Sequence, residues 1–320
     1  MKGNATMRHY LKSLVAVFAL ILATGPIAGA ADFMYITNGG QGPSFVSKFD
    51  QLGTYYGRIT TNLNSPAGIA QDSSGNIFIV NNGNNTVSLF DKDMNFTSTI
   101  DNTYLGGGAQ IAAIDKYNNL YVSLLNGNIV KYDSSENYVM TISGAGRNSN
   151  AQGMVLDAQD NLYVASYGTN SVEIFDSASG AWKSRITGNG LAGPHGVARD
   201  GNGYLYVTNA TANTISKFNP DGTANTVFNG GGVLSFPIGI GFDSAGDFFV
   251  ANNGNNTSTK YDANGNLLLT IPNTNLAGAR WLAFQPYFVP EPSTYALAAI
   301  ASGVMAVLAR RRKQLQIQAS

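Results

Sequence analysis

The chain has no cysteine, two histidines (His9 and His195) and few charged residues, which make up 12% of its 320 residues. Without cysteine there are no disulfides, no thiolate metal sites and no cysteine nucleophile. A chain of this length can still bury a large core. The 37 glycines indicate a fold with many tight turns, because glycine adopts positive φ at no steric cost.

Charge is distributed unevenly along the chain. Seven of the 19 basic residues lie within residues 1–12 and 310–320, whereas residues 31–289 carry 12 basic and 18 acidic residues, a net charge of −6. Binding to the phosphates of a nucleic acid needs clustered Lys and Arg. We therefore expect no nucleic-acid partner.

The first 30 residues have the organisation of a secretory signal peptide. Residues 1–12 are basic, residues 14–23 form a short apolar run, and residues 28–30 (Ala-Gly-Ala) offer small side chains for cleavage. The alternative is a retained membrane helix, which would need about 20 apolar residues to span the bilayer. We predict that residues 1–30 are a signal peptide.

Residues 287–320 form a second distinct segment. An apolar, Ala-rich run over residues 293–309 is followed by a basic cluster. A helix over this run would be about 25 Å long, against a hydrocarbon core of ~30 Å, so we expect one marginal transmembrane helix with its basic end in the cytoplasm. The residues that mark the segment are Pro290, Glu291, Pro292, Arg310, Arg311 and Arg312.

This segment resembles the PEP-CTERM sorting signal, which combines a Pro-Glu-Pro motif, one helix and an arginine cluster. The resemblance implies a Gram-negative, exopolysaccharide-producing bacterium, in which an exosortase, a membrane cysteine transpeptidase, cleaves near the motif. It also implies that the protein is membrane-anchored through its C-terminal helix before processing and then reaches the cell surface or the extracellular matrix. The alternative is an ordinary C-terminal membrane anchor.

Between these ends, one unit of about 43 residues repeats. Short runs of β-forming residues recur with an aromatic residue at intervals of 42 or 43, and a second run ending in Asp precedes most of them. With the Gly- and Asn-rich turns, each unit contains four antiparallel strands, which is one propeller blade. The aligned aromatic residues are Tyr35, Phe78, Tyr121, Tyr163, Tyr206 and Phe249.

The number of units and their phase predict an all-β, six-bladed β-propeller over residues 31–286. The first unit lacks its opening strand, and residues 281–285 (WLAFQ) supply one more strand after the last unit. We expect this strand to pair with residues 33–36, so that the N- and C-terminal strands close the ring.

The units GIAQDSSGNIFIVNNGNNTVSLFD and GVARDGNGYLYVTNATANTISKFNPDG resemble the NHL repeat, a β-propeller blade. The resemblance covers nearly all of residues 32–285 and implies fold rather than activity, since propellers serve as enzymes and as adaptors. The family has Asp after the second strand, whereas this chain departs from that pattern, and the blades at Leu124 and Ser166 are the weakest by this measure. The residues at this position are Asn38, Asn81, Leu124, Ser166, Asn209 and Asn252.

Propeller topology sorts the polar residues onto two faces. Fifteen of the 19 acidic residues fall in the turns after the first and third strands of each blade, where Asp accepts hydrogen bonds from backbone amides. The alternative is calcium binding in turns such as residues 91–95 (DKDMN), although this sequence lacks the later Gly and Glu of a calcium loop. We predict no metal site and no cofactor.

On the opposite face, the residue two places before the apolar pair of each first strand should form a ring around the channel mouth. Neutral amides and nearby aromatic residues such as Tyr167 and Trp281 suit a hydroxyl-rich or peptide ligand. The alternative is that the loop asparagines only adopt left-handed turns. The ring positions are Ala67, Gln110, Gln152, His195, Ile238 and Arg280, and we predict ligand contacts from Gln110, Gln152, His195, Arg280, Asn81, Asn209 and Asn252.

Catalysis is a second possibility, centred on His195. Residues 193–196 (GPHG) resemble the Pro-His-Gly of virginiamycin B lyase, a propeller in which a His acts as acid and base. By that resemblance His195 is a candidate acid/base in a lyase or hydrolase, with Arg280 stabilising an oxyanion. The metal mechanism of NHL-type lyases needs several His ligands, and residues 31–320 contain one His.

The sequence thus predicts an exported, non-catalytic binding module at the cell surface or in the exopolysaccharide matrix. Its expected partners are an exosortase and an extracellular polysaccharide or protein, with membrane contact through the C-terminal helix before processing. The alternatives are the lyase or hydrolase and a structural matrix protein without a discrete ligand.

Overall fold

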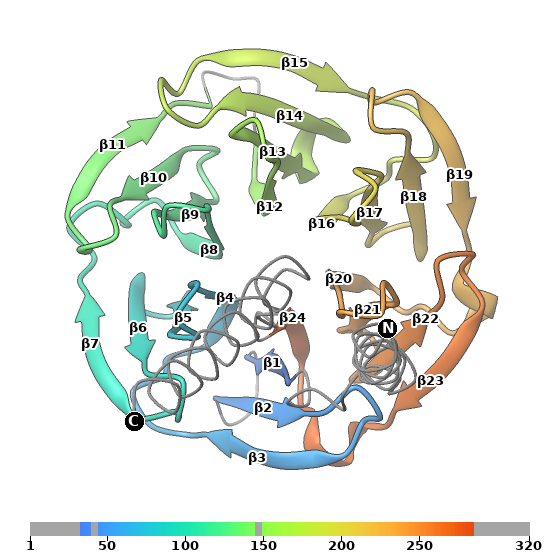
Figure 1. The fold of residues 1–320 in the computed structure, drawn as a ribbon, viewed down its shortest axis with the longest axis horizontal. Helices are drawn as coiled ribbons and strands as arrows, with labels where there is room; N and C mark the ends of the chain where they lie inside the picture. The colour runs from blue at the N-terminus through green and yellow to red at the C-terminus, as the bar shows by residue number, and fades with distance from the viewer. Residues whose placement is uncertain (1–32, 40–43, 145–148, 285–320) are drawn as a thin grey trace, which may run out of the picture. The chain divides into compact units, whose positions relative to one another are not determined.

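The computed structural model describes residues 33–39, 44–144 and 149–284, which form the six-bladed β-propeller that the repeat predicts (Figure 1). Each blade is a four-stranded antiparallel sheet, and its four strands follow one another in order from the central channel to the rim. The predicted signal peptide (1–30) and sorting segment (287–320) lie outside the described residues.

The innermost strands surround the channel, and each begins at one face and ends at the other, where five of the six lead into an Asp-containing turn. We call the face where they begin the ring face and the opposite one the turn face. Each strand has a β-bulge against its neighbour near the ring face. The innermost strands are β4 (Pro66–Gln71), β8 (Ala109–Ile114), β12 (Ala151–Leu156), β16 (Pro194–Arg199), β20 (Pro237–Phe242) and β24 (Ala279–Phe284).

The second strands are the most deeply buried elements, because neighbouring blades cover both of their faces. Nearly all of their residues are buried. The run of β-branched and aromatic residues in each strand therefore reflects packing on two sides. These strands are β1 (Met34–Asn38), β5 (Ile77–Asn81), β9 (Leu120–Leu124), β13 (Asn161–Ser166), β17 (Leu205–Asn209) and β21 (Phe248–Asn252).

The third strands are mostly buried, whereas the outermost strands expose most of their residues to solvent. In five of the six outermost strands only the last residue is buried. The third strands are β2 (Phe45–Phe49), β6 (Thr86–Phe90), β10 (Ile129–Tyr132), β14 (Ser171–Asp176), β18 (Thr214–Phe218) and β22 (Thr257–Tyr261). The outermost strands are β3 (Tyr55–Ile59), β7 (Phe96–Ile100), β11 (Tyr138–Ile142), β15 (Trp182–Ile186), β19 (Ala224–Phe228) and β23 (Leu267–Ile271).

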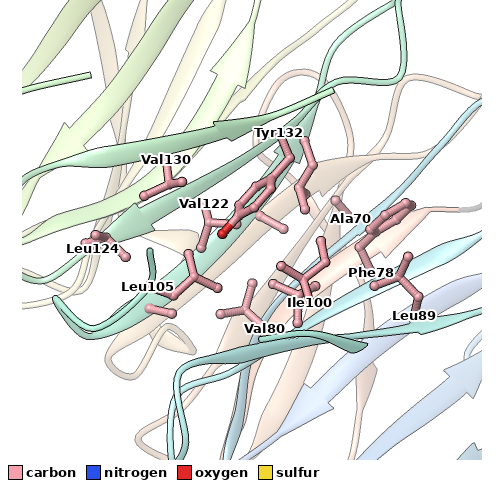
Figure 2. Packing of buried hydrophobic residues seen from close by; sticks show 14 residues of the cluster. Ala70, Phe78, Val80, Leu89, Ile100, Leu105, Val122, Leu124, Val130 and Tyr132 are labelled. Carbon is pink, nitrogen blue, oxygen red and sulfur yellow. The ribbon is translucent and has the colours of Figure 1, made fainter. Parts of the chain in front are cut away.

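Three short 3-10 helices lie in loops of the described residues: η1 (Tyr167–Thr169), η2 (Gly230–Gly232) and η3 (Asn273–Asn275). Hydrophobic side chains fill the spaces between blades. Between the blade β4–β7 and the blade β8–β11, Val80 and Ile100 pack against Val122 and Tyr132 from the facing sheet (Figure 2). The blades at Leu124 and Ser166 have all four strands.

The ring closes by pairing strands from the two ends of the propeller. β24 is antiparallel to β1, with Tyr35 opposite Ala283 and Ile36 opposite Leu282, and the first blade has the order β24-β1-β2-β3. This confirms the predicted closure. It ties the chain after the predicted signal peptide to the chain before the sorting segment.

Candidate functional site

The six ring residues occupy the second position of the innermost strands, as their spacing predicts. Ala67, Gln152 and Ile238 are buried, with 3%, 4% and 8% of their surface exposed. Gln110, His195 and Arg280 are partly exposed. These three side chains are therefore the ring residues best placed to meet a ligand.

The two ring glutamines use their amide nitrogens within the protein. Gln110 Nε2 donates to the carbonyl oxygens of Ala109 at 3.0 Å and Gly108 at 3.4 Å, and Gln152 Nε2 donates to Oδ1 of Asn150. An amide carbonyl oxygen still has two acceptor sites. Gln110 accordingly presents an acceptor rather than a donor.

His195 has an unsatisfied polar atom. Its Nδ1 is buried and has no hydrogen-bond partner within the described residues. The imidazole packs edge to face against Tyr167, with 5.4 Å between ring centroids, and against Phe236 at 6.0 Å. Burial, and secondarily the charge of Arg280, lower its pKa to about 4, so the imidazole is neutral at pH 7.

Arg280 is a partly buried cation without an acidic partner in the described part of the chain. Burial lowers its pKa from the usual value. Among the described acidic residues, only Asp101 lies in a loop of the ring face, directly after the outermost strand β7. The charge of Arg280 is therefore not neutralised locally.

Each of the six blades has one residue in the left-handed conformation just before its innermost strand. Five blades place Gly, Asn or Ser at this position, which tolerate positive φ, but the sixth has Phe236 with φ 45°. A bulky side chain in this conformation costs roughly 1–2 kcal/mol. The equivalent residues are Ser65, Gly108, Asn150, Gly193, Phe236 and Gly278.

The predicted ligand contacts Asn81, Asn209 and Asn252 are placed beneath the ring face, with at most 1% of their surface exposed. The side-chain oxygen of Asn81 accepts from the backbone of Asn64, and its amide donates to Ser88 Oγ at 2.8 Å. Asn209 and Asn252 make the equivalent bonds in their own blades. All three fix the loop that leads into the innermost strand.

Other loop asparagines connect neighbouring blades. Asn85, Asn170, Asn213 and Asn256 are left-handed, and each side-chain oxygen accepts a backbone N–H of the next blade, at 2.6–3.0 Å. Their conformation agrees with the turn interpretation. The bond to the following blade is a further role that the sequence did not suggest.

Trp281 separates the ring from the channel below it. The side chain is buried, with 4% exposure, and it extends to Gly153 of β12, on the opposite blade. Trp281 is the third residue of its strand, and four of the other five innermost strands have a glycine at this position: Gly68, Gly153, Gly196 and Gly239. A Cβ atom at any of these glycines would contact the backbone of the next innermost strand. Trp281 thus lies under the ring rather than beside a ligand.

On the turn-face side of Trp281, the channel holds a cavity of about 340 Å³. All six innermost strands line it, with apolar side chains such as Met154, Val197 and Ile240, and with Arg199. Arg199 lies over the ring of Tyr163, with 4.8 Å from Cζ to the centroid, and 3.9 Å from Asp157. Its charge is therefore compensated, unlike that of Arg280.

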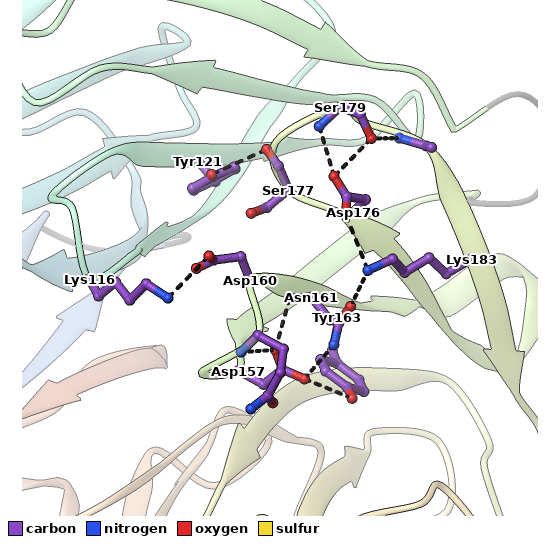
Figure 3. A network of polar contacts seen from close by, with 12 residues as sticks. Lys116, Tyr121, Asp157, Asp160, Asn161, Tyr163, Asp176, Ser177, Ser179 and Lys183 are labelled. Atoms are coloured by element: carbon purple, nitrogen blue, oxygen red, sulfur yellow. Dashed lines mark hydrogen bonds and ion pairs between the residues drawn. The ribbon is translucent and has the colours of Figure 1, made fainter.

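The turn face carries the acidic residues in hydrogen-bonded turns, as predicted. Asp157 accepts from the backbone and side chain of Asn161 and from the hydroxyl of Tyr163 (Figure 3). In the turn considered for calcium, Asp91 accepts from the backbones of Asp93 and Asn95. Across the described residues, no three His, Cys, Asp or Glu side chains come together as a metal site.

Residues 288–313 match the PEP-CTERM protein-sorting motif. The match implies export, sorting to the cell surface and processing by an exosortase. None of the helices in the described part of the chain is long and apolar enough to cross a membrane, and the predicted helix over residues 293–309 lies outside that part. No curated protein matches the chain in sequence.

Solved structures share the fold at low sequence identity. A chain of the nidogen/laminin complex has a TM-score of 0.70 and 13% identity, covering 80% of this chain and 99% of its own. A protein of unknown function from Bacteroides caccae has a TM-score of 0.64 and 12% identity, covering 81% of this chain and 100% of its own. Catalytically inactive virginiamycin B lyase from Staphylococcus aureus with quinupristin has a TM-score of 0.58 and 14% identity, covering 81% of this chain and 94% of its own. At such identities the likeness shows the β-propeller fold alone.

Proposed function

We propose that this exported propeller is a non-catalytic binding module that holds an extracellular glycan or protein on its ring face, at the cell surface or in the surrounding matrix. The observation that carries the proposal is the partly exposed Arg280, which has no acidic partner among the described residues and lies on the same face as the partly exposed Gln110 and His195. A cation without a local counter-charge on an open face favours a ligand with acceptor groups.

The ring supplies complementary groups for such a ligand. Gln110 offers an acceptor, Arg280 offers several donors, and Tyr167 and Phe236 flank His195 with aromatic surface. Gln152 and the asparagines Asn81, Asn209 and Asn252 support the site from below, through the loops and strands that position the exposed side chains.

An array of glycans and peptides probed with the purified exported protein tests this function. We expect selective binding that the triple substitution Gln110→Ala, His195→Ala and Arg280→Ala removes, with unchanged circular dichroism. Equal binding by the substituted protein would move the site away from the ring. Absence of binding to every class on the array would favour a structural matrix protein.

The second candidate is a lyase or hydrolase in which His195 is the acid/base. The observation that favours it is the partly exposed His195 within residues 193–196, which resemble the Pro-His-Gly of a propeller lyase, with the partly exposed Arg280 on the same face. A lyase or hydrolase activity that is lost in His195→Ala while ligand binding persists would support this candidate over the binding module.

For sorting, we propose that an exosortase cleaves near Pro290, Glu291 and Pro292, after the basic cluster Arg310, Arg311 and Arg312 has retained the segment in the membrane. Substituting the Pro-Glu-Pro residues by alanine should leave the unprocessed protein in the membrane fraction, as seen by immunoblotting. Removing only the arginines should instead release unprocessed protein from the cell, because the membrane anchor loses its cytoplasmic end.

A further inference from the structure

In one part of the ring, three successive blades contribute a cation, an apolar residue and a neutral imidazole. Arg280 on β24, Ile238 on β20 and His195 on β16 occupy equivalent positions on neighbouring strands. A cation and a neutral imidazole thus flank an apolar residue. Phe236 precedes Ile238 in the same chain segment, and 38% of its surface is exposed.

The backbone at Phe236 indicates that its exposed ring serves a purpose. The left-handed conformation is unfavourable for a bulky residue, and five equivalent positions avoid this cost with Gly, Asn or Ser. The conformation is enforced by hydrogen bonds: Phe236 N donates to Asn213 Oδ1 at 2.6 Å, and its carbonyl oxygen accepts from Asn253 N at 3.2 Å. Strain that persists at one of six repeated sites points to a function.

The hydrogen-bonding state of His195 also favours an external acceptor. A neutral imidazole carries one N–H, and the buried Nδ1 has no acceptor among the described residues. Buried N–H groups without a partner are rarer than unsatisfied acceptors, so the proton is better placed on Nε2, which is not among the buried, unpartnered atoms. This end of the ring therefore presents donors, at Arg280 and at His195.

We propose that Arg280, His195 and Phe236 form a subsite for a uronate, a sugar unit that carries a carboxylate, with the buried Ile238 beneath it. The guanidinium binds the carboxylate as a bidentate partner, the apolar face of the sugar ring packs on Phe236, and a hydroxyl accepts the N–H of His195. This inference rests on the proposed binding function and adds the chemical class of the ligand.

Two features favour an acidic sugar over other anions. The donors are separated by apolar surface, which fits a ring with one charged substituent better than a small inorganic ion. The acceptor of Gln110 further along the ring suits the hydroxyl of another sugar unit. An acidic peptide would supply carboxylates but would lack the flat face that stacks on Phe236.

The test compares trigalacturonate with its methyl ester, which has the same rings and hydroxyls but no charge, by isothermal titration calorimetry on the purified exported protein. We expect the acid to bind roughly tenfold more tightly at low salt and to lose this advantage as salt is raised. Arg280→Gln should bring the acid down to the affinity of the ester and leave the ester unaffected.

Phe236→Gly separates a role in binding from a role in folding. Glycine adopts the left-handed conformation freely, so this variant should unfold at a higher urea concentration and yet bind trigalacturonate about fivefold more weakly. Ser65→Gly changes the equivalent left-handed position of another blade. It should likewise raise the urea midpoint and leave the affinity unchanged.

Several outcomes would overturn the inference. Equal affinity for the acid and the ester, or no effect of Arg280→Gln, would leave a binding module for neutral ligands. Tighter binding of a Glu-rich peptide than of trigalacturonate would replace the sugar by a peptide. A lower urea midpoint for Phe236→Gly would make its ring a structural element. If no glycan or peptide binds, the proposed function itself fails.

Discussion

The indole of Trp281 reaches Gly153 across the channel, so that a Cβ atom at Gly153 would lie 2.5 Å from Cη2 of Trp281 and 2.6 Å from the carbonyl oxygen of His195. β24 and β12 belong to opposite blades. One side chain thus closes the channel beneath the ring and joins the two halves of the propeller. The floor under the candidate site depends on this contact.

Gly153→Ala should therefore destabilise the fold by about 1–3 kcal/mol, the usual cost of overpacking a core. The clash involves backbone atoms of β16, which cannot rotate away as a side chain can. Urea unfolding measures the change. Gly201→Ala is the matched control, because a Cβ there meets nothing within 4 Å, and an equal loss in both variants would contradict the proposed packing.

Arg185→Met should be strongly destabilising, although Arg185 lies on the outermost strand β15. It pairs with Glu173, which is fully buried and also accepts from Ser171 Oγ at 2.7 Å and Trp182 Nε1 at 2.9 Å. Loss of the arginine leaves a buried carboxylate without its cation, at a cost of roughly 3–5 kcal/mol.

Glu173→Gln tests the same pair from the other side. The glutamine keeps the shape of the side chain and part of its hydrogen bonding. The free energy of unfolding, measured by urea denaturation, should therefore fall less than in Arg185→Met. A larger loss from the glutamine variant would show that the charge of Glu173 is needed for reasons other than its pairing with Arg185.

The stability of the propeller should fall between pH 7 and pH 5 because of His195. Its pKa is about 4 in the folded protein and about 6.5 in the unfolded chain. The unfolded state therefore binds the proton first, so the stability contributed by the neutral imidazole is present above pH 6.5 and is lost as the pH falls toward 4. Urea unfolding at several pH values should show a loss of about 1–2 kcal/mol by pH 5.

The same experiment on His195→Gln identifies the group responsible. Carboxylates with ordinary pKa values titrate mostly below this range, and residues 31–320 contain one histidine. In this variant the free energy of unfolding should no longer fall between pH 7 and pH 5. A retained slope would assign the pH dependence to other groups.

Asp72→Ala should cost about 1–3 kcal/mol, because Oδ1 of this buried carboxylate accepts the backbone N–H groups of Ser74 and Asn76 at 2.8 Å each. Asp262→Ala breaks the same kind of turn at an exposed site and should cost less. We expect EDTA to leave the Tm of the wild-type protein unchanged. A large decrease in Tm would favour calcium in the turns instead.

The repeat made the fold predictable, because each blade carries the same strands and turns and the closing strand at residues 281–284 is visible as an extra unit. The ring positions followed from the same alignment. The directions of individual side chains were less accessible. Every innermost strand has a bulge near the ring face, and a bulge breaks the two-residue alternation on which such predictions depend.

Trp281 and Phe236 illustrate the difference. Trp281 was expected near a ligand, but the glycines at its level in four other blades make room for it inside the channel. Phe236 could have been found by aligning the residues before each innermost strand, where it stands among Gly, Asn and Ser. The burial of Asn81, Asn209 and Asn252 depends on partners in the third strands, whose register the sequence alone leaves open.

The pairing of β1 with β24 also sets how the molecule responds to force. Met34 lies opposite Phe284, and Asn38 lies opposite Ala279, so both ends of the propeller leave the same end of one strand pair. Pulling these two ends apart would peel the strands one bond at a time. A pull at Phe284 opposed by a load on the ring face would instead strain all the bonds of β24 together, which is the direction in which an antiparallel pair yields least easily.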